Sequence, residues 1–86
     1  METREFVVTA DVGLHARPAA EFAKIAQQSG LTITVQKPSG PAVSASSPLR
    51  LLTLKVATSE SIVVTIDTED VKLAQDIFDQ LEAAIR

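Results

Sequence analysis

The strongest constraint on the fold is the alternation of apolar and polar residues in three short stretches of the chain. Apolar side chains at every second position predict half-buried strands over residues 3–10, 31–36 and 62–66. A fourth, shorter strand over residues 42–45 should run antiparallel to the second, because the turn at residues 38–41 is too short for a parallel crossover. Each strand has one apolar face, so the sheet should be covered on one side only.

Two longer stretches carry apolar residues at helical spacing. The first predicts an amphipathic helix over residues 16–28, with Pro18 in its first turn and Gly30 at its C-terminal end. The second predicts a helix that follows Thr68, the expected N-cap. Its predicted buried stripe consists of Val71, Ala74, Ile77, Phe78, Leu81 and Ile85.

A third, short helix should lie between these two. Ser47 followed by Pro48 is the order of an N-cap and a first helical position, and the leucines that follow favour a helix ending near Lys55. The resulting order is strand, helix, strand, strand, helix, strand, helix. It predicts an α/β (α+β) two-layer open-faced sandwich in a single domain over residues 1–86, with three helices on one face of a four-stranded antiparallel sheet.

Composition removes several kinds of site. The chain has no cysteine and only one histidine, which excludes disulfides and multi-histidine metal sites, so we expect neither a metal nor a cofactor. No apolar stretch is long enough to span a bilayer, and residues 1–5 are charged where a signal peptide turns apolar. We therefore expect a cytoplasmic protein without membrane insertion. Nucleic-acid binding is disfavoured because tyrosine and tryptophan are absent and the three phenylalanines lie on predicted buried stripes.

Charge is distributed unevenly along the chain. The formal net charge is −3, yet the only acidic residue between positions 12 and 59 is Glu21. The same segment contains five basic residues, namely Arg17, Lys24, Lys37, Arg50 and Lys55. This distribution favours a local anion site, although scattered solvated charge would explain it equally well.

His15 lies immediately before the first predicted helix. Free backbone N–H groups at a helix start favour a bound anion, and we assign this phosphate-stabilising role to Ala16, Arg17 and Pro18. The Arg17 guanidinium adds a fixed cation with a fork suited to phosphate oxygens. Gly13 permits a tight turn that exposes His15, whose ring nitrogen could then attack phosphorus.

Plainer interpretations of the histidine compete with this one. A lone histidine at a helix start is often a capping residue or a packed core residue. A catalytic triad could be written from Asp11, His15 and one of the serines, but the sequence gives no geometry for it. The adjacent Arg17 favours the anion site, because an arginine is useful beside a bound anion and costly beside an uncompensated helix end.

Two motifs carry a family resemblance. Residues 13–19, Gly-Leu-His-Ala-Arg-Pro-Ala, resemble the phosphohistidine motif of HPr, the histidine-containing phosphocarrier proteins of the bacterial phosphoenolpyruvate-dependent sugar phosphotransferase system. Residues 47–54, Ser-Pro-Leu-Arg-Leu-Leu-Thr-Leu, are similar to the second signature of that family, a serine that opens a short apolar helix. The resemblance covers essentially the whole chain. It also shows a departure, since Lys55 stands where the family usually has glycine.

The resemblance implies a phosphocarrier and not an enzyme. His15 would accept a phosphoryl group at Nδ1 from enzyme I and pass it to enzyme IIA domains. Ser47, with Ser46 as second choice, would be a regulatory phosphorylation site, which adds an HPr kinase/phosphorylase and transcriptional regulators to the conceivable partners. From the residues alone, Ser47 is first of all a helix cap.

Three alternatives stay open at this point. The chain could belong to a nitrogen-related regulatory phosphotransfer branch, which would preserve every motif described. It could be a regulatory paralogue that binds partners without carrying phosphate, although the presence of His15 counts against this. More distantly, its first six elements have the order of a ferredoxin-like binding module.

A docking surface should surround His15 on the rim of the first two helices. Four leucines within residues 49–54 are more than one face of so short a helix can bury, so at least one should reach solvent, and Leu49 is our choice. The plainer alternative is that all four are core. We expect a monomer, and its predicted docking residues are Ala16, Arg17, Ala20, Lys24, Pro48, Leu49, Arg50 and Leu52.

Overall fold

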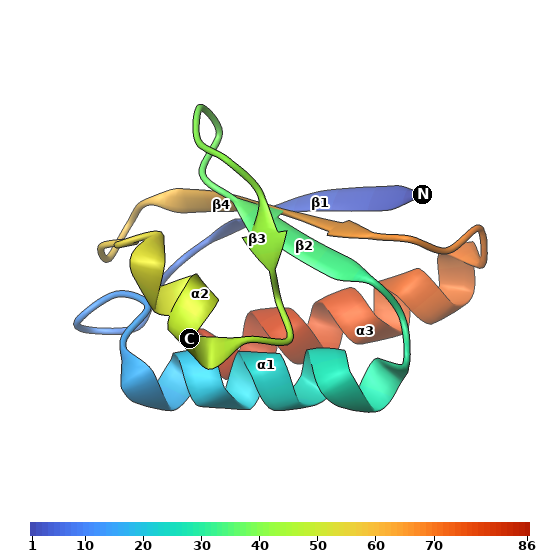
Figure 1. Ribbon diagram of the computed structural model, residues 1–86, viewed down its shortest axis with the longest axis horizontal. Coiled ribbons are helices and arrows are strands. Elements are labelled where there is room, and N and C mark those ends of the chain that lie inside the picture. Colours follow the sequence, from blue (N-terminus) through green and yellow to red (C-terminus); the bar gives the residue numbers. More distant parts are fainter.

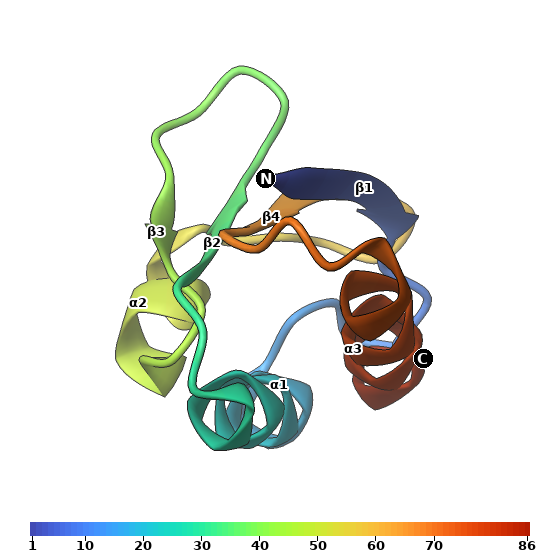
Figure 2. The ribbon, with the colours of Figure 1, turned by 90° about the vertical axis from the view of Figure 1, so that its right-hand side faces the viewer.

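Four antiparallel strands form a sheet, and three helices cover one of its faces (Figure 1, Figure 2). The computed structural model describes residues 1–86. Its elements are β1 (Glu2–Val7), α1 (Ala16–Ser29), β2 (Ile33–Gln36), β3 (Val43–Ser44), α2 (Pro48–Thr53), β4 (Ser61–Ile66) and α3 (Val71–Ala84). The strand order across the sheet is β1-β4-β2-β3. The predicted open-faced sandwich and its βαββαβα order are confirmed.

β1 ends three residues before the predicted end. Its ladder with β4 runs from Glu2 opposite Ile66 to Val7 opposite Ser61, so it stops where β4 begins. The alternation in burial nevertheless continues, since Val8 and Ala10 are buried. Val8 donates to Glu60 O (2.9 Å) and accepts from Ser59 N (2.8 Å). The alternating pattern therefore reported burial correctly but overstated the length of the strand.

The middle strands are also shorter than predicted. β2 begins at Ile33 and not at Leu31, because the Leu31 N–H turns back to the Ser29 hydroxyl (3.1 Å) at the end of α1. Gly30 ends α1 as predicted, in the left-handed conformation with φ 70°. β3 keeps only two of its four predicted residues, and Ala45 donates one more bond to Ile33 O (2.9 Å) before the chain turns toward α2.

α3 begins later than its predicted cap. The carboxylate of Asp70, not the Thr68 hydroxyl, caps the helix by accepting from Leu73 N (3.0 Å). Thr68 accepts from Asp70 N (3.1 Å) in the preceding turn. Val71 was predicted to be buried but is 49% exposed, because it lies in the first turn of α3, which projects past the end of α1 in Figure 1. None of the helices is long and apolar enough to cross a membrane.

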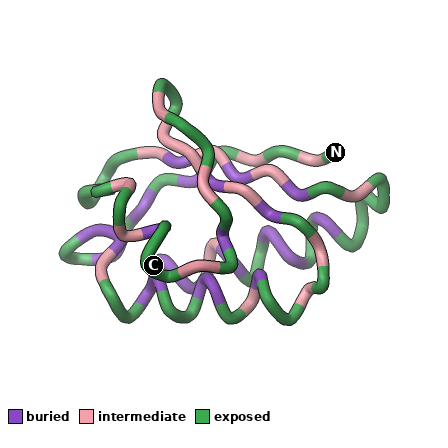
Figure 3. Tube along the Cα trace, viewed as in Figure 1, coloured by how far each residue is buried: buried purple, intermediate pink, exposed green.

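Apolar side chains between the sheet and the helices form one core of 21 buried residues, and no polar or charged residue is buried. Figure 3 marks the buried positions along the chain in purple. Phe6 of β1 and Phe78 of α3 meet edge to face, with ring centroids 6.0 Å apart. The guanidinium of Arg4 lies 4.9 Å from the Phe78 ring centroid. Its Nη1 lies 2.9 Å from the Asp79 carboxylate and 3.6 Å from that of Glu82. These contacts hold α3 against β1.

α2 is one and a half turns long. The Ser47 hydroxyl caps it by accepting from Arg50 N (3.3 Å), as predicted. The helix ends at Thr53, two residues before the predicted end, because Lys55 adopts the left-handed conformation with φ 54°. A lysine thus occupies a conformation that glycine adopts at lower cost.

Candidate functional site

His15 occupies the N-cap position of α1 with an imidazole that takes no part in capping. Its backbone is extended (φ −98°, ψ −170°), and its side chain makes no capping hydrogen bond. The residue is half-buried. Neither a capping role for the ring nor a core role fits these observations, so the imidazole is available at the helix start.

Two backbone N–H groups face the same helix end. The first N–H that is bonded within α1 belongs to Ala19, which donates to His15 O (3.0 Å). Those of Ala16 and Arg17 precede it and have no acceptor inside the helix. Pro18 has no N–H and is buried, so it fixes the first turn and cannot donate to an anion. Of the three residues assigned to the anion site, Ala16 and Arg17 have donors.

The guanidinium of Arg17 points along its own helix. Its Nη1 lies 3.2 Å from Glu21 Oε1, and the two side chains are 60% and 52% exposed. An exposed ion pair between residues four apart on a helix contributes only about 0.3–0.5 kcal/mol. Arg17 can therefore exchange Glu21 for an anion beside His15 at little cost.

Gly13 sits where no other residue fits. Its φ is +73°, and a Cβ atom there would lie 2.3 Å from Val56 O and 2.9 Å from Ala57 Cα. Leu14 N donates to the same Val56 oxygen (2.9 Å). The turn before His15 thus rests directly on the backbone of residues 56 and 57. Sequence analysis predicted the tight turn but not this close approach.

The 55–60 segment, which carries this backbone, was missed by sequence analysis. Thr58 Oγ1 donates to Ala10 O (2.6 Å) and to Asp11 O (2.9 Å), which ties the segment to the loop between β1 and α1. No periodic pattern marks a loop of this kind. The one available signal was Lys55 in place of the glycine that the resembled family usually has, and Lys55 keeps the left-handed backbone conformation that favours glycine.

The leucines of α2 divide between core and surface. Leu51 is fully buried, Leu49 is 76% exposed, and Leu52 and Leu54 are half-buried. The prediction that Leu49 reaches solvent is confirmed, and the alternative that all four leucines are core is wrong. A solvent-facing leucine on a short helix is a suitable apolar anchor for a partner.

The other predicted docking residues are at or near the surface. Ala16, Arg17, Ala20, Lys24, Pro48 and Arg50 are exposed. α1 packs against α2, which lies over the N-terminal half of α1 in Figure 1. The Gln27 side chain joins the two by donating to Ser46 O (2.7 Å). We call the predicted docking residues of α1 and α2 the site rim, which comprises Ala16, Arg17, Ala20, Lys24, Pro48, Leu49, Arg50 and Leu52; all are exposed except the half-buried Leu52.

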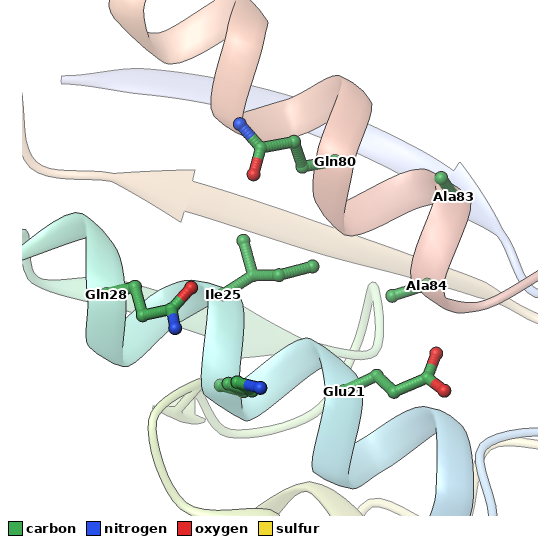
Figure 4. Close-up of a pocket in the computed structure, with 7 residues that line it drawn as sticks. Glu21, Ile25, Gln28, Gln80, Ala83 and Ala84 are labelled. Atoms are coloured by element: carbon green, nitrogen blue, oxygen red, sulfur yellow. The ribbon is translucent and has the colours of Figure 1, made fainter.

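The hollows of the surface lie elsewhere. Both are between α1 and α3, and neither includes His15. Figure 4 shows the larger one, with Ile25 of α1 facing Gln80 and Ala84 of α3. Lys24 of the site rim lines its edge. Neither hollow therefore adjoins the ring of His15.

Comparison with known proteins identifies the family. The chain matches the family model described as the PTS HPr component phosphorylation site over residues 2–86. The chain belongs to the HPr family. It is 38% identical over 71 residues to the phosphocarrier protein HPr of Streptomyces coelicolor, covering 83% of this chain and 76% of that protein. It is 41% identical over 69 residues to the HPr of Vibrio cholerae, covering 80% and 78% of the two chains.

The fold agrees with this assignment. The crystal structure of HPr from Bacillus anthracis matches with a TM-score of 0.83 and 28% sequence identity, covering 99% of this chain and 96% of that one. The resemblance found in the sequence to the phosphocarriers of the phosphotransferase system is confirmed, and the ferredoxin-like binding module is excluded.

Proposed function

We propose that this HPr family member accepts a phosphoryl group from enzyme I on His15 and passes it to enzyme IIA domains for sugar uptake. The observation that carries the proposal is the imidazole of His15, which stands at the start of α1 without a capping bond, beside two N–H groups that lack helix acceptors. The absence of His15 from either surface hollow fits a carrier that is served by protein partners and turns over no small substrate.

The proposed transfer uses one ring nitrogen of His15 as the nucleophile. The lone pair of Nδ1 attacks phosphorus, the new N–P bond forms as the bond to the donor group breaks, and the electron pair of the broken bond leaves with the donor. Onward transfer repeats the exchange, with His15 as the leaving group. The Ala16 and Arg17 N–H groups stabilise the phosphoryl oxygens, and the Arg17 guanidinium leaves Glu21 to add its charge.

The site rim is the proposed docking surface for both partners. Leu49 provides an exposed apolar side chain on α2, and Arg17, Lys24 and Arg50 provide exposed basic side chains on α1 and α2. A surface of this kind attracts an acidic partner and speeds its association. Arg50→Glu should slow the association with enzyme I, most strongly at low salt.

The test is phosphorylation by purified enzyme I and labelled phosphoenolpyruvate. We expect one label per chain, which is lost in acid because the N–P bond of a phosphohistidine is acid-labile, and no label in His15→Ala. Label that persists in His15→Ala, or that survives acid, would refute the carrier mechanism. Phosphorylation only by the enzyme I of a nitrogen-related branch would assign the chain to that branch instead of sugar uptake.

We also propose Ser47 as a site of regulatory phosphorylation by an HPr kinase/phosphorylase. Its hydroxyl lies at the start of α2, next to Pro48 and Leu49 of the site rim, and the residue is half-buried. A phosphate there would add a charge of about −2 beside Leu49 and Arg50 and would repel an acidic partner. Ser46, whose hydroxyl is bonded to that of Ser44 (2.8 Å), is the matched control. Ser47→Asp should weaken enzyme I binding more than Ser46→Asp, and equal affinities would contradict the proposal.

A further inference from the structure

One peptide group links the turn before His15 to an acidic side chain outside the site rim. The carbonyl oxygen of the Val56–Ala57 peptide accepts from Leu14 N (2.9 Å), and Leu14 directly precedes His15. The N–H of the same peptide donates to Glu60 Oε1 (2.7 Å). The oxygen is also the atom that a Cβ at Gly13 would meet at 2.3 Å. This single peptide therefore connects the Glu60 carboxylate to the backbone of the turn.

Glu60 is itself anchored. Lys37 Nζ lies 3.4 Å from Glu60 Oε1 and donates to Lys55 O (3.0 Å). Lys37 follows the end of β2 and Glu60 precedes the start of β4, and these two strands pair in the sheet. Lys55 has the positive φ at which the chain bends after α2. The side chain of Lys37 therefore binds the carbonyl oxygen of the residue at this bend. The carboxylate is thus tied to the rigid part of the fold.

The carboxylate is charged at neutral pH. The backbone hydrogen bond from Ala57 lowers the pKa of Glu60 below its ordinary value of 4.5, and Lys37 adds to the effect against partial desolvation. A hydrogen bond to an ionised acceptor is stronger than one between neutral groups. It also polarises the peptide, which strengthens the bond that its oxygen makes to Leu14 N.

We propose that Glu60, held by Lys37, is a positioning residue for His15, because its carboxylate fixes the peptide on which the Gly13–Leu14 turn rests. The inference rests on the proposed function of His15. It extends the site beyond the site rim to a carboxylate and an ammonium group that do not touch the reacting atoms.

A purely structural role makes a different prediction. Glu60 N also donates to Ala57 O (3.1 Å), so the residue closes a turn and could merely stabilise the fold. In that case removing the side chain would increase exchange at amides throughout the chain. Positioning predicts a local effect, concentrated at Leu14 and at the ring of His15.

The experiment compares Glu60→Ala, Glu60→Gln and Glu5→Ala in the full chain. Glu5 is an exposed glutamate of β1 with no ion pair and serves as the control for the loss of one negative charge. We measure amide hydrogen exchange, the NMR signals of the His15 ring, and kcat and KM for phosphorylation by enzyme I. The ring signals and the exchange rates report position whether or not phosphorylation occurs.

In Glu60→Ala we expect the Leu14 amide to exchange about tenfold faster relative to core amides, and the His15 ring signals to shift. We expect kcat to fall about fivefold with KM within about twofold, since the site rim that docks the partner is intact. Glu60→Gln keeps an acceptor oxygen for Ala57 N and should recover most of the loss. Glu5→Ala should match the wild type.

Two results would overturn the proposal. One is a Leu14 amide that stays as protected in Glu60→Ala as in the wild type. The other is a uniform increase in exchange with unchanged His15 ring signals, which would reduce Glu60 to a structural residue. A wild-type chain that accepts no phosphoryl group would instead refute the proposed function, while the NMR measurements would still decide the positioning role.

Discussion

Arg4 and Arg17 show how differently two regions of this molecule use the same side chain. At the corner between β1 and α3, the guanidinium of Arg4 lies beside two carboxylates and over an aromatic ring, and its side chain is 32% exposed. In the site rim, Arg17 has one partner, on its own helix, and is 60% exposed. The first arginine closes a contact between two elements. The second makes one side-chain hydrogen bond, to Glu21, and its other N–H groups have no partner within the chain.

A pair of leucines and a pair of glycines also differ in their surroundings. Within α2, Leu51 is fully buried and Leu49 faces solvent. Gly13 and Gly30 have nearly the same positive φ, yet only Gly13 lies against other backbone atoms. In the leucine pair, as in the arginine pair, the member in the site rim is the more exposed one, whereas in the glycine pair the member next to His15 is the one packed against the fold. Exposed apolar side chains and unpaired hydrogen-bonding groups that gather in one small region are typical of a binding surface and not of a packed core.

The leucine pair gives the largest expected difference. Leu51→Ala should lower the free energy of unfolding by about 2–5 kcal/mol, because it leaves a cavity in the core. Leu49→Ala should change it by about 0.5 kcal/mol or less, since the side chain is already in water. Chemical denaturation measures both. Leu49→Ala should in turn weaken the binding of enzyme I or enzyme IIA, and a Leu49→Ala protein that unfolds would place the docking surface elsewhere.

The glycine pair separates backbone strain from close approach. Gly30→Ala should cost about 1–2 kcal/mol, which is the strain of a left-handed φ with open space around it. Gly13→Ala should cost about 2–4 kcal/mol, because the same strain is joined by the contact with Val56 O. Thermal or denaturant unfolding gives the two values. Equal costs would mean that the turn before His15 moves away from the 55–60 segment without penalty.

The two arginines should have opposite effects: removal of Arg4 should lower stability, and removal of Arg17 should slow phosphoryl transfer. Arg4→Ala should cost about 1–2 kcal/mol of stability through the lost cation–π contact and ion pairs, and should leave phosphorylation unchanged. Arg17→Ala should leave the melting temperature nearly unchanged and slow phosphorylation by enzyme I about tenfold, a loss of one charge-assisted contact to the phosphoryl group. A wild-type rate in Arg17→Ala would contradict the role proposed for Arg17.

Much of the fold could be predicted from the sequence because it depends on local patterns. Alternation and helical spacing identified the longer strands and helices, the turn at residues 38–41 indicated β3, and Ser47–Pro48 with the leucines that follow indicated α2. Ser47 and Gly30 marked their helix ends correctly. Errors arose where the apolar pattern continues beyond the end of the strand or the covered part of the helix. Burial continues to Ala10 after the ladder of β1 has stopped, and Val71 shares the spacing of a stripe that is not covered at its start.

The site was predictable only where it is contiguous in sequence. Residues 13–19 could be recognised because they form one contiguous motif in the sequence. Glu60 and Lys37 act through contacts between residues 23 apart in sequence. They also act through a backbone peptide group, which is common to nearly all residue types, so its role cannot be predicted from the sequence. The ion pair between Arg17 and Glu21 was not predicted from the sequence either, because it forms only where Arg17 has no stronger partner.

The smallest expected effect concerns the pH dependence of the Glu60 contacts. Since the pKa of Glu60 is lower in the folded chain than its ordinary value of 4.5, the unfolded chain binds the proton more readily. The stabilisation is therefore fully present above about pH 4.5 and is lost as the pH falls through the folded pKa. Glu60→Gln cannot titrate, so the stability difference between wild type and Glu60→Gln should be constant near neutral pH and shrink on acidification.

Lys37→Met sharpens this last prediction, because it keeps an apolar stem and removes the ammonium group. The hydrogen bond from Ala57 N has the largest effect on Glu60, so its pKa should rise in Lys37→Met but stay below 4.5. NMR titration of the Glu60 carboxyl carbon measures this directly. A pKa that returned to 4.5 would show that the ammonium group, and not the Val56–Ala57 peptide, lowers the pKa of Glu60. The hydrogen bond from Ala57 N would then add nothing to the stability of the charged carboxylate.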